Sequence, residues 1–498
     1  MRVLPGSKPQ RNAASQRRSE PRHGDPSLTL LRSISPALLL AALFAAPAAA
    51  KILDVPGVPQ VRVEVKRNGD DWRAEFDFDR GVTAWVFPRS AITREAGKPW
   101  RDQSWTVETR GVRLERRGNY DYLRADRGEV PRHVSVRFRP VAENLRADYA
   151  PALRFTDGSV GLFVAQFEVF PLDSLGEVRA LPNDLNNFMR PVTEIEYRFQ
   201  DASGTVLLDG RRSARASTSG AVTYALFGAT RAVETPDMVA ILDPQLPAWT
   251  RESLTRAVPA LMSRYSQELG ALRKFKPTFM VSWAGATPGI VSRNGSTLPG
   301  LIVLNYEGEG MLTETVRERQ QGLWFIAHEA AHFWLGQTVG YEYARDAWIT
   351  EGGAELLSLR AVAELDPSFD ARKELNQAIE DCIRLTRRRG VEGARERGEQ
   401  RAYYACGTTF GLVAEAGSGR SFYKFVRQLV DASRADGVVS RADWLAALDV
   451  ATRKPALGRD SAQLLDRGAS NPGEIITRLL ESAGADFEAD VAGIPRLR

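Results

Sequence analysis

Histidine and cysteine are both scarce in this chain. Its 498 residues include four His and two Cys. Beyond residue 50 the only His are His133, His328 and His332. The last two flank a glutamate, and in a chain so poor in His a chance pairing of this kind is expected only about once in several hundred cases. The region around residue 330 is therefore the first candidate for a functional site.

Long apolar runs are also lacking. The one candidate, residues 37–44, is too short to span a bilayer and is followed by small residues that end in an Ala-x-Ala site at 48–50. This order is typical of a secretory signal peptide, and no Cys is present there for a lipoprotein anchor. We therefore expect a polar basic extension over residues 1–27, a signal peptide over 28–50, and a periplasmic or secreted protein with no stable membrane span after signal cleavage.

An excess of one charge is absent once the leader is set aside. The first 50 residues hold seven Lys or Arg and two acidic residues. The whole chain has 67 basic and 62 acidic residues, so 60 of each sign remain. The net charge of +5 belongs to the leader, and we expect no nucleic-acid partner.

The two cysteines are Cys382 and Cys406. In the oxidising compartment that export implies, a disulfide between them can persist. Such a bridge would tie the helix around Asp381 to the segment that contains Tyr404. Two buried free thiols are the alternative.

Residues 328–332 form the motif His-Glu-Ala-Ala-His. On a helix His328 and His332 share one face, with Cβ atoms roughly 6 Å apart, so both can bind one metal ion. Glu329 lies one step round, where its carboxylate can hold a metal-activated water and take its proton. The alternative is a packed, hydrogen-bonded pair of core histidines.

A tetrahedral catalytic zinc needs a third protein ligand and one open position. Glu351 is the candidate, because eighteen residues separate it from His332. That length allows the first helix to end, a loop to return and a second helix to begin near Trp348. We expect one Zn²⁺ bound by His328, His332 and Glu351.

The two segments HEAAHFWLG (328–336) and WITEGGA (348–354) together resemble the zinc aminopeptidases typified by aminopeptidase N and leukotriene hydrolase, of the gluzincin family. The similarity extends to the eighteen-residue gap and to a Trp three residues before the ligand Glu. It implies a thermolysin-like catalytic domain, with Glu329 as general base. It also implies a catalytic Tyr before a Lys-Gly step; here the match is Tyr404-Ala405-Cys406-Gly407, with Cys406 in place of Lys.

Tyr404 is therefore the candidate that stabilises the oxyanion, Tyr403 is the fallback, and for either the alternative is an aromatic packed on a helix. Glu355 follows Glu351 by four residues on the same face. In related metallopeptidases a carboxylate near this position accepts the outer N–H of a ligand His; a solvated helix face is the alternative.

One part of the family pattern is missing. The family has a Gly-x-Met-Glu-Asn segment whose Glu binds the free α-amino group of the substrate. The similar place here, residues 294–301, contains Thr297 and no carboxylate. The resemblance favours an aminopeptidase, and the missing Glu favours an endopeptidase.

Alternating apolar residues over 51–243 predict an antiparallel β-sandwich domain. Helical spacing then begins, and we expect a thermolysin-like, mainly helical catalytic domain over 244–410 and a helical carboxy-terminal region over 411–498. The fold class is α+β. Thr313 is expected to cap the zinc helix, and Gly336 and Gly340 to end it. Residues 301–305 are the candidate edge strand for extended substrate backbone, with a plain core strand as the alternative.

The sequence thus predicts an exported zinc metallopeptidase that hydrolyses a peptide or protein substrate through a metal-activated water, aminopeptidase-like in specificity. An endopeptidase of the same clan is one alternative. A non-catalytic periplasmic metal-binding or assembly protein is another. The intact Glu329 favours an enzyme, because a purely structural zinc needs no base.

Overall fold

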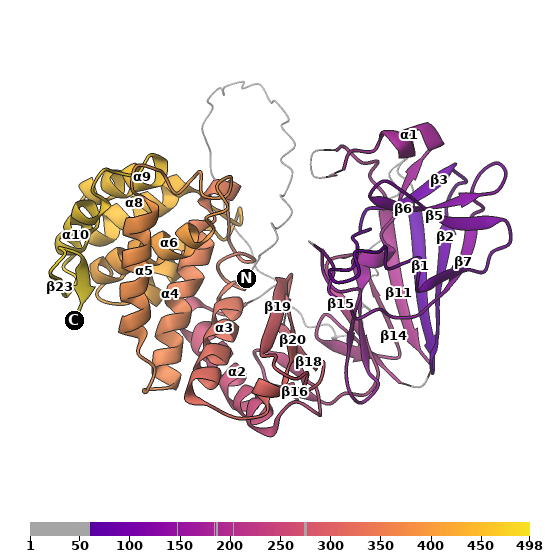
Figure 1. Cartoon of the computed structure of the whole chain (residues 1–498), viewed down its shortest axis with the longest axis horizontal. Helices are drawn as coiled ribbons and strands as arrows, with labels where there is room; N and C mark the ends of the chain where they lie inside the picture. Colours follow the sequence, from indigo (N-terminus) through magenta and orange to yellow (C-terminus); the bar gives the residue numbers. More distant parts are fainter. Residues whose placement is uncertain (1–59, 147, 184, 186–187, 203, 273–275) are drawn as a thin grey trace, which may run out of the picture. The chain divides into compact units, whose positions relative to one another are not determined.

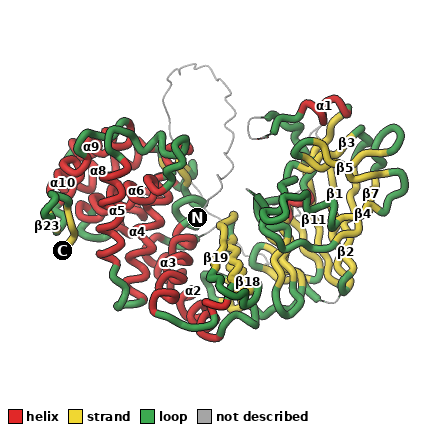
Figure 2. Tube along the Cα trace, in the orientation of Figure 1, coloured by secondary structure: helices red, strands yellow, loops and turns green. Residues whose placement is uncertain are grey.

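The computed structural model describes residues 60–498 except 147, 184, 186–187, 203 and 273–275. The expected extension and signal peptide, residues 1–50, lie outside the described residues. Strands dominate the first half of the described chain and helices the second half (Figures 1 and 2). This order agrees with the predicted α+β class. No helix in this part of the chain is long and apolar enough to cross a membrane.

The largest sheet begins with a hairpin of β1 (Gln60–Asn68) and β2 (Asp71–Phe78). Gly69 takes the left-handed conformation in the turn, at φ +61°. Along both strands every second side chain is buried, as the alternating sequence predicted. The six strands lie in the order β14 (Arg215–Thr218), β11 (Glu194–Asp201), β1, β2, β7 (His133–Phe138) and β4 (Trp105–Val107).

Two smaller sheets complete the amino-terminal region. The four-stranded sheet has the order β10 (Phe170–Leu172), β3 (Ala84–Phe87), β6 (Tyr120–Ala125) and β5 (Val112–Arg117). The five-stranded sheet has the order β13 (Arg211–Ser213), β12 (Val206–Leu208), β15 (Tyr224–Phe227), β9 (Val160–Phe163) and β8 (Ala152–Arg154). Pairing is antiparallel except between β1 and β11, which are parallel. The six-stranded sheet is therefore mixed, whereas the sequence predicted an antiparallel sandwich; the other two sheets are antiparallel.

A fourth, mixed sheet belongs to the second half of the fold. Its order is β16 (Ala232–Glu234), β17 (Val239–Leu242), β18 (Thr278–Trp283), β20 (Leu301–Glu307) and β19 (Ser292–Leu298). Because β17 pairs with β18, residues 232–242 join this sheet rather than the sandwich to which the sequence assigned them. The prediction of residues 301–305 as the edge strand was wrong. β20 lies between β18 and β19, so β19 is the edge.

The helices follow, after the short α1 (Leu175–Ala180) of the first half. They are α2 (Ala248–Leu269), α3 (Val316–Ala331), α4 (Trp348–Leu365), α5 (Ala371–Leu385), α6 (Arg401–Gly417), α7 (Phe422–Ser433), α8 (Arg441–Thr452), α9 (Ala456–Asp466) and α10 (Pro472–Ala483). α6 is continuous across residues 410 and 411, where the sequence predicted a domain boundary. Two strand pairs, β21 (Gly340–Tyr341) with β22 (Val438–Val439) and β23 (Phe487–Ala489) with β24 (Pro495–Leu497), complete the fold.

The helix of the HExxH motif, α3, begins two residues later than predicted. Thr315 is its N-cap and accepts a hydrogen bond from the backbone N–H of Glu318, so the assignment of Thr313 as the cap was wrong. The helix ends at Ala331, with His332 as its C-cap, and not at Gly336. α3 therefore presents His328 and Glu329 from its last turn and His332 from its C-cap.

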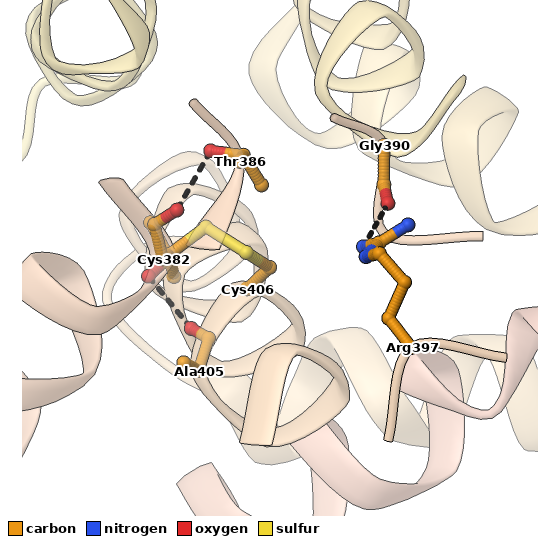
Figure 3. Close-up of a disulfide and its surroundings, with 7 residues drawn as sticks. Cys382, Thr386, Gly390, Arg397, Ala405 and Cys406 are labelled. Carbon is orange, nitrogen blue, oxygen red and sulfur yellow. Dashed lines mark hydrogen bonds between the residues drawn. A yellow bond between two sulfur atoms is a disulfide. The ribbon is translucent and has the colours of Figure 1, made fainter. Parts of the chain in front are cut away.

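α4 packs against both α3 and α6, and α5 packs against α6. α4 and α6 approach each other closely because Gly352 of α4 lies against Gly407 of α6. A Cβ built on Gly352 would lie 2.2 Å from the Cα of Gly407. A disulfide joins Cys382 of α5 to Cys406 of α6, with Thr386 hydrogen-bonded to the carbonyl of Cys382 (Figure 3). The predicted bridge is confirmed, and the free-thiol alternative is excluded.

Candidate metal centre

Three side chains converge where α3 meets α4. His328 comes from the last turn of α3, His332 from its C-cap, and Glu351 from the first turn of α4. Nε2 of His328 lies 3.2 Å from Nε2 of His332. Oε2 of Glu351 lies 3.5 Å and 3.6 Å from these two nitrogens. The structure thus brings together the three residues that the sequence predicted as ligands.

The donor set fits a metal ion. Two imidazole nitrogens at 3.2 Å from one another would bring lone pairs together if both were neutral and nothing lay between them. Oε2 of Glu351 is buried and has no hydrogen-bond partner within the described chain. A cation among the three atoms satisfies both conditions, and two imidazoles with one carboxylate are typical ligands of catalytic zinc.

The outer nitrogens of both imidazoles face oxygen atoms. Nδ1 of His332 is 2.9 Å from the carbonyl oxygen of Leu335, and Nδ1 of His328 is 3.2 Å from Oε2 of Glu355. The carbonyl oxygen of Leu335 accepts the N–H at Nδ1 of His332, and the negative charge of Glu355 favours a proton at Nδ1 of His328, so Nε2 of each ring is the nitrogen that can bind a metal. Glu355 therefore lies where the sequence predicted a partner for a ligand histidine.

The three candidate ligands shift one another's pKa in the metal-free protein. Burial alone would lower the pKa of His328, but Glu351 and Glu355 outweigh it and raise this pKa to about 10. Burial and Glu351 oppose each other in the same way at His332, whose pKa is also raised. Burial would raise the pKa of Glu351, yet the two imidazoles lower it well below its usual range. Without an ion, the three side chains therefore neutralise one another as ion pairs.

Glu329 is buried beside the ligand group, and its Oε2 accepts a hydrogen bond from the hydroxyl of Thr297 on the edge strand β19. One carboxylate oxygen is thus held by the strand. In the sequence Thr297 stands only as the residue present where the family has a carboxylate, and no role was predicted for it. Its position in the segment before the zinc helix was the available signal, but a contact to Glu329 cannot be inferred from spacing.

Tyr404 lies over the ligand group from α6. Its ring stacks on that of His328, with centroids 5.6 Å apart and planes at 24°. Burial and the adjacent carboxylate of Glu351 raise the pKa of Tyr404 far above its usual value. The phenol therefore stays protonated and can donate a hydrogen bond. Tyr403, the fallback candidate, packs in the hydrophobic core.

Comparisons with known proteins agree with this fold. No family model and no curated protein matches the sequence. Among solved structures, an aminopeptidase N family protein from Idiomarina loihiensis is similar at a TM-score of 0.57 and 11% identity, over 84% of this chain and 78% of that one. An M1 zinc metallopeptidase from Deinococcus radiodurans gives 0.43 and 15%, over 82% and 92%. Leukotriene A4 hydrolase from Saccharomyces cerevisiae gives 0.45 and 11%, over 83% and 68%.

The first of these similarities defines the class of fold. This chain folds as an aminopeptidase N family protein does, with an amino-terminal region rich in strands and a helical carboxy-terminal part. The resemblance that the HExxH segment indicated is therefore confirmed at the level of the fold.

Proposed function

We propose that this protein is an exported zinc metallopeptidase of aminopeptidase-like type. The observation that supports this most directly is that His328, His332 and Glu351 meet at one point. The carboxylate of Glu329, which is not one of the three candidate ligands, lies beside them. A structural zinc site would need no such base. The fold shared with an aminopeptidase N family protein is consistent with the same activity.

In this proposal His328, His332 and Glu351 would hold the ion. When bound, Zn²⁺ supplies a Lewis acid that polarises the scissile carbonyl and makes a water molecule more acidic. Glu329 takes the proton of that water and later delivers it to the leaving nitrogen. Thr297 holds Oε2 of Glu329, which leaves Oε1 free to accept this proton. Tyr404 donates its phenolic hydrogen to the oxygen on which negative charge develops.

One observation favours a second candidate activity, which differs in the position of the peptide bond that is cleaved. Thr297 occupies the place where the resemblance implies a carboxylate for the free α-amino group, and its hydroxyl is used to hold Glu329. An endopeptidase, which needs no partner for an α-amino group, is therefore the alternative within the same chemistry.

The disulfide supports the proposed export. Cys382 and Cys406 are both fully buried and bonded to each other, and such bridges persist mainly in oxidising compartments. We therefore propose that the mature protein acts in the periplasm or outside the cell, with a peptide or protein as substrate.

The proposal is tested with Glu329→Gln and a peptide library that contains free and blocked amino termini. We expect the variant to bind zinc as the wild type does but to lose peptidase activity at least a hundredfold, because a positioned base contributes about 10²–10⁴-fold. Cleavage of free termini only would establish an aminopeptidase, and cleavage of blocked peptides would establish an endopeptidase. Full activity of Glu329→Gln, or no zinc in the purified wild type, would contradict the proposal.

A further inference from the structure

Both oxygens of Glu355 have partners. Oε2 lies 3.2 Å from Nδ1 of His328 and accepts a hydrogen bond of 3.2 Å from Nε1 of Trp324. Oε1 lies 3.6 Å from Nη1 of Arg401, on α6. A carboxylate held at one oxygen can still rotate about its last bond, whereas a partner at the second oxygen fixes its plane. The orientation of Glu355 toward His328 therefore depends on Arg401.

Arg401 is itself held from α5. Its Nε donates a hydrogen bond of 2.9 Å to Oδ2 of Asp381, so the guanidinium bridges Asp381 and Glu355. The residue after Asp381 is Cys382, which is bonded to Cys406 on α6, the helix of Arg401. Both ends of the ion pair are thus attached to helices that a covalent bond keeps together.

We propose that Arg401 is a positioning residue for the metal centre, which acts through Glu355 on the ring of His328. The inference rests on the proposed zinc function. Asp381, Arg401, Glu355 and His328 form a chain of successive ionic contacts that ends at the buried site. No pattern in the sequence indicates this role, because both partners of Arg401 lie on other helices.

The effect should appear in metal affinity. Outer partners of metal-binding side chains typically change metal affinity by about 10–100-fold when they are removed. The Arg401 side chain is 40% exposed, and exposed ion pairs are weak by themselves. We therefore expect the low end of the range, about tenfold.

The test compares Arg401→Gln with Arg384→Gln as a matched control. Arg384 also donates to Asp381, at 2.8 Å, but its side chain is 61% exposed and forms no hydrogen bond or ion pair with Glu355 among the described residues. We expect Arg401→Gln to weaken zinc binding about tenfold in a chelator competition, and to alter the visible absorption of the Co²⁺-loaded protein. Arg384→Gln should leave both unchanged, and thermal unfolding should show that both variants are folded.

A double-mutant cycle separates an action through Glu355 from general disturbance of the helices. If Arg401 acts through Glu355, the change Arg401→Gln should cost little further zinc affinity in a Glu355→Gln background. Equal affinity of Arg401→Gln and wild type within twofold, additive losses in the double variant, or equal losses in Arg384→Gln would overturn the proposal. These measurements use no peptide, so a protein that binds zinc as described but cleaves nothing would refute the peptidase function and leave the role of Arg401 intact.

Discussion

At the scale of single residues, the position of the candidate base depends on one hydroxyl group. Thr297 donates to Oε2 of Glu329, and no other hydrogen bond to this carboxylate is found in the described chain. We expect Thr297→Val, which is nearly isosteric, to lower kcat about tenfold with little change in KM, because a hydrogen bond to a charged group is worth about 1.5–3 kcal/mol and part of it is regained from water. Steady-state kinetics on a peptide substrate measures this.

Thr297→Ser is the control, because it keeps the hydroxyl and should retain most of the activity. A Thr297→Val enzyme with unchanged kcat would show that Glu329 is positioned by its helix alone. A rise in KM without a fall in kcat would instead assign Thr297 to substrate binding.

The histidine ligands predict a release of protons on metal binding. In the metal-free protein the pKa of His328 is about 10 and that of His332 is also raised, so at pH about 8 His328 is protonated, whereas a metal binds only the neutral ring. Zinc binding at that pH should therefore release at least one proton, and zinc affinity should rise about tenfold per pH unit for each proton released. Glu351 contributes no proton, because its pKa is lowered and it is already ionised.

Calorimetry of zinc binding in two buffers with different ionisation enthalpies gives the number of protons directly. Binding that releases none, with an affinity independent of pH between about 7 and 9, would contradict the ion-paired arrangement of the metal-free site.

At the scale of elements, the distance between α4 and α6 depends on two glycines. A Cβ on Gly407 would lie 2.2 Å from the carbonyl oxygen of Trp348 and 2.7 Å from the Cα of Gly352. These are backbone atoms, so the helices must separate to accept it. We expect Gly407→Ala to cost about 1–3 kcal/mol in unfolding free energy and also to lower kcat, because α6 contains Tyr404 and α4 contains Glu351.

Denaturant unfolding together with kinetics tests this, with Gly176→Ala as control. Gly176 lies in the exposed helix α1, where an added Cβ meets only the Ser174 hydroxyl at 3.5 Å, and alanine should be neutral or slightly stabilising there. If Gly407→Ala were as stable and active as the wild type, the close packing of α4 and α6 would not determine the geometry of the site.

The elements also show which features the sequence could predict. The spacing of His328 and His332 and the length of the gap to Glu351 were sufficient to predict that the three side chains meet. Helical periodicity and loop length are local properties that can be read from the sequence. The edge strand was assigned wrongly: β20 is the more apolar strand, but whether a strand lies at an edge depends on its neighbours. The contacts of Thr297 with Glu329 and of Arg401 with Glu355 are tertiary in the same way, and no pattern in the chain encodes them.

At the scale of the whole molecule, the candidate metal centre lies within an extensive core that does not depend on a metal. The hydrophobic cluster around it includes buried residues from α2 through α10 and from the sheet of β17, β18 and β20. A second cluster fills the amino-terminal sheets. A protein with so large a core should remain folded without an ion, unlike small zinc domains that unfold when the metal is removed.

Metal removal should therefore lower stability without unfolding the protein. An ion that binds only the native state stabilises it by about 4 kcal/mol when its free concentration is a thousand times Kd, so a chelator should lower the thermal midpoint by on the order of ten degrees at most. The far-ultraviolet circular dichroism at low temperature should stay unchanged, and added zinc should restore the midpoint. Glu351→Gln should respond far less to zinc, because one of three ligands is lost. Loss of helical signal on chelation at low temperature would mean that the ion is structural, and the open position required for peptide hydrolysis would then lose its main support.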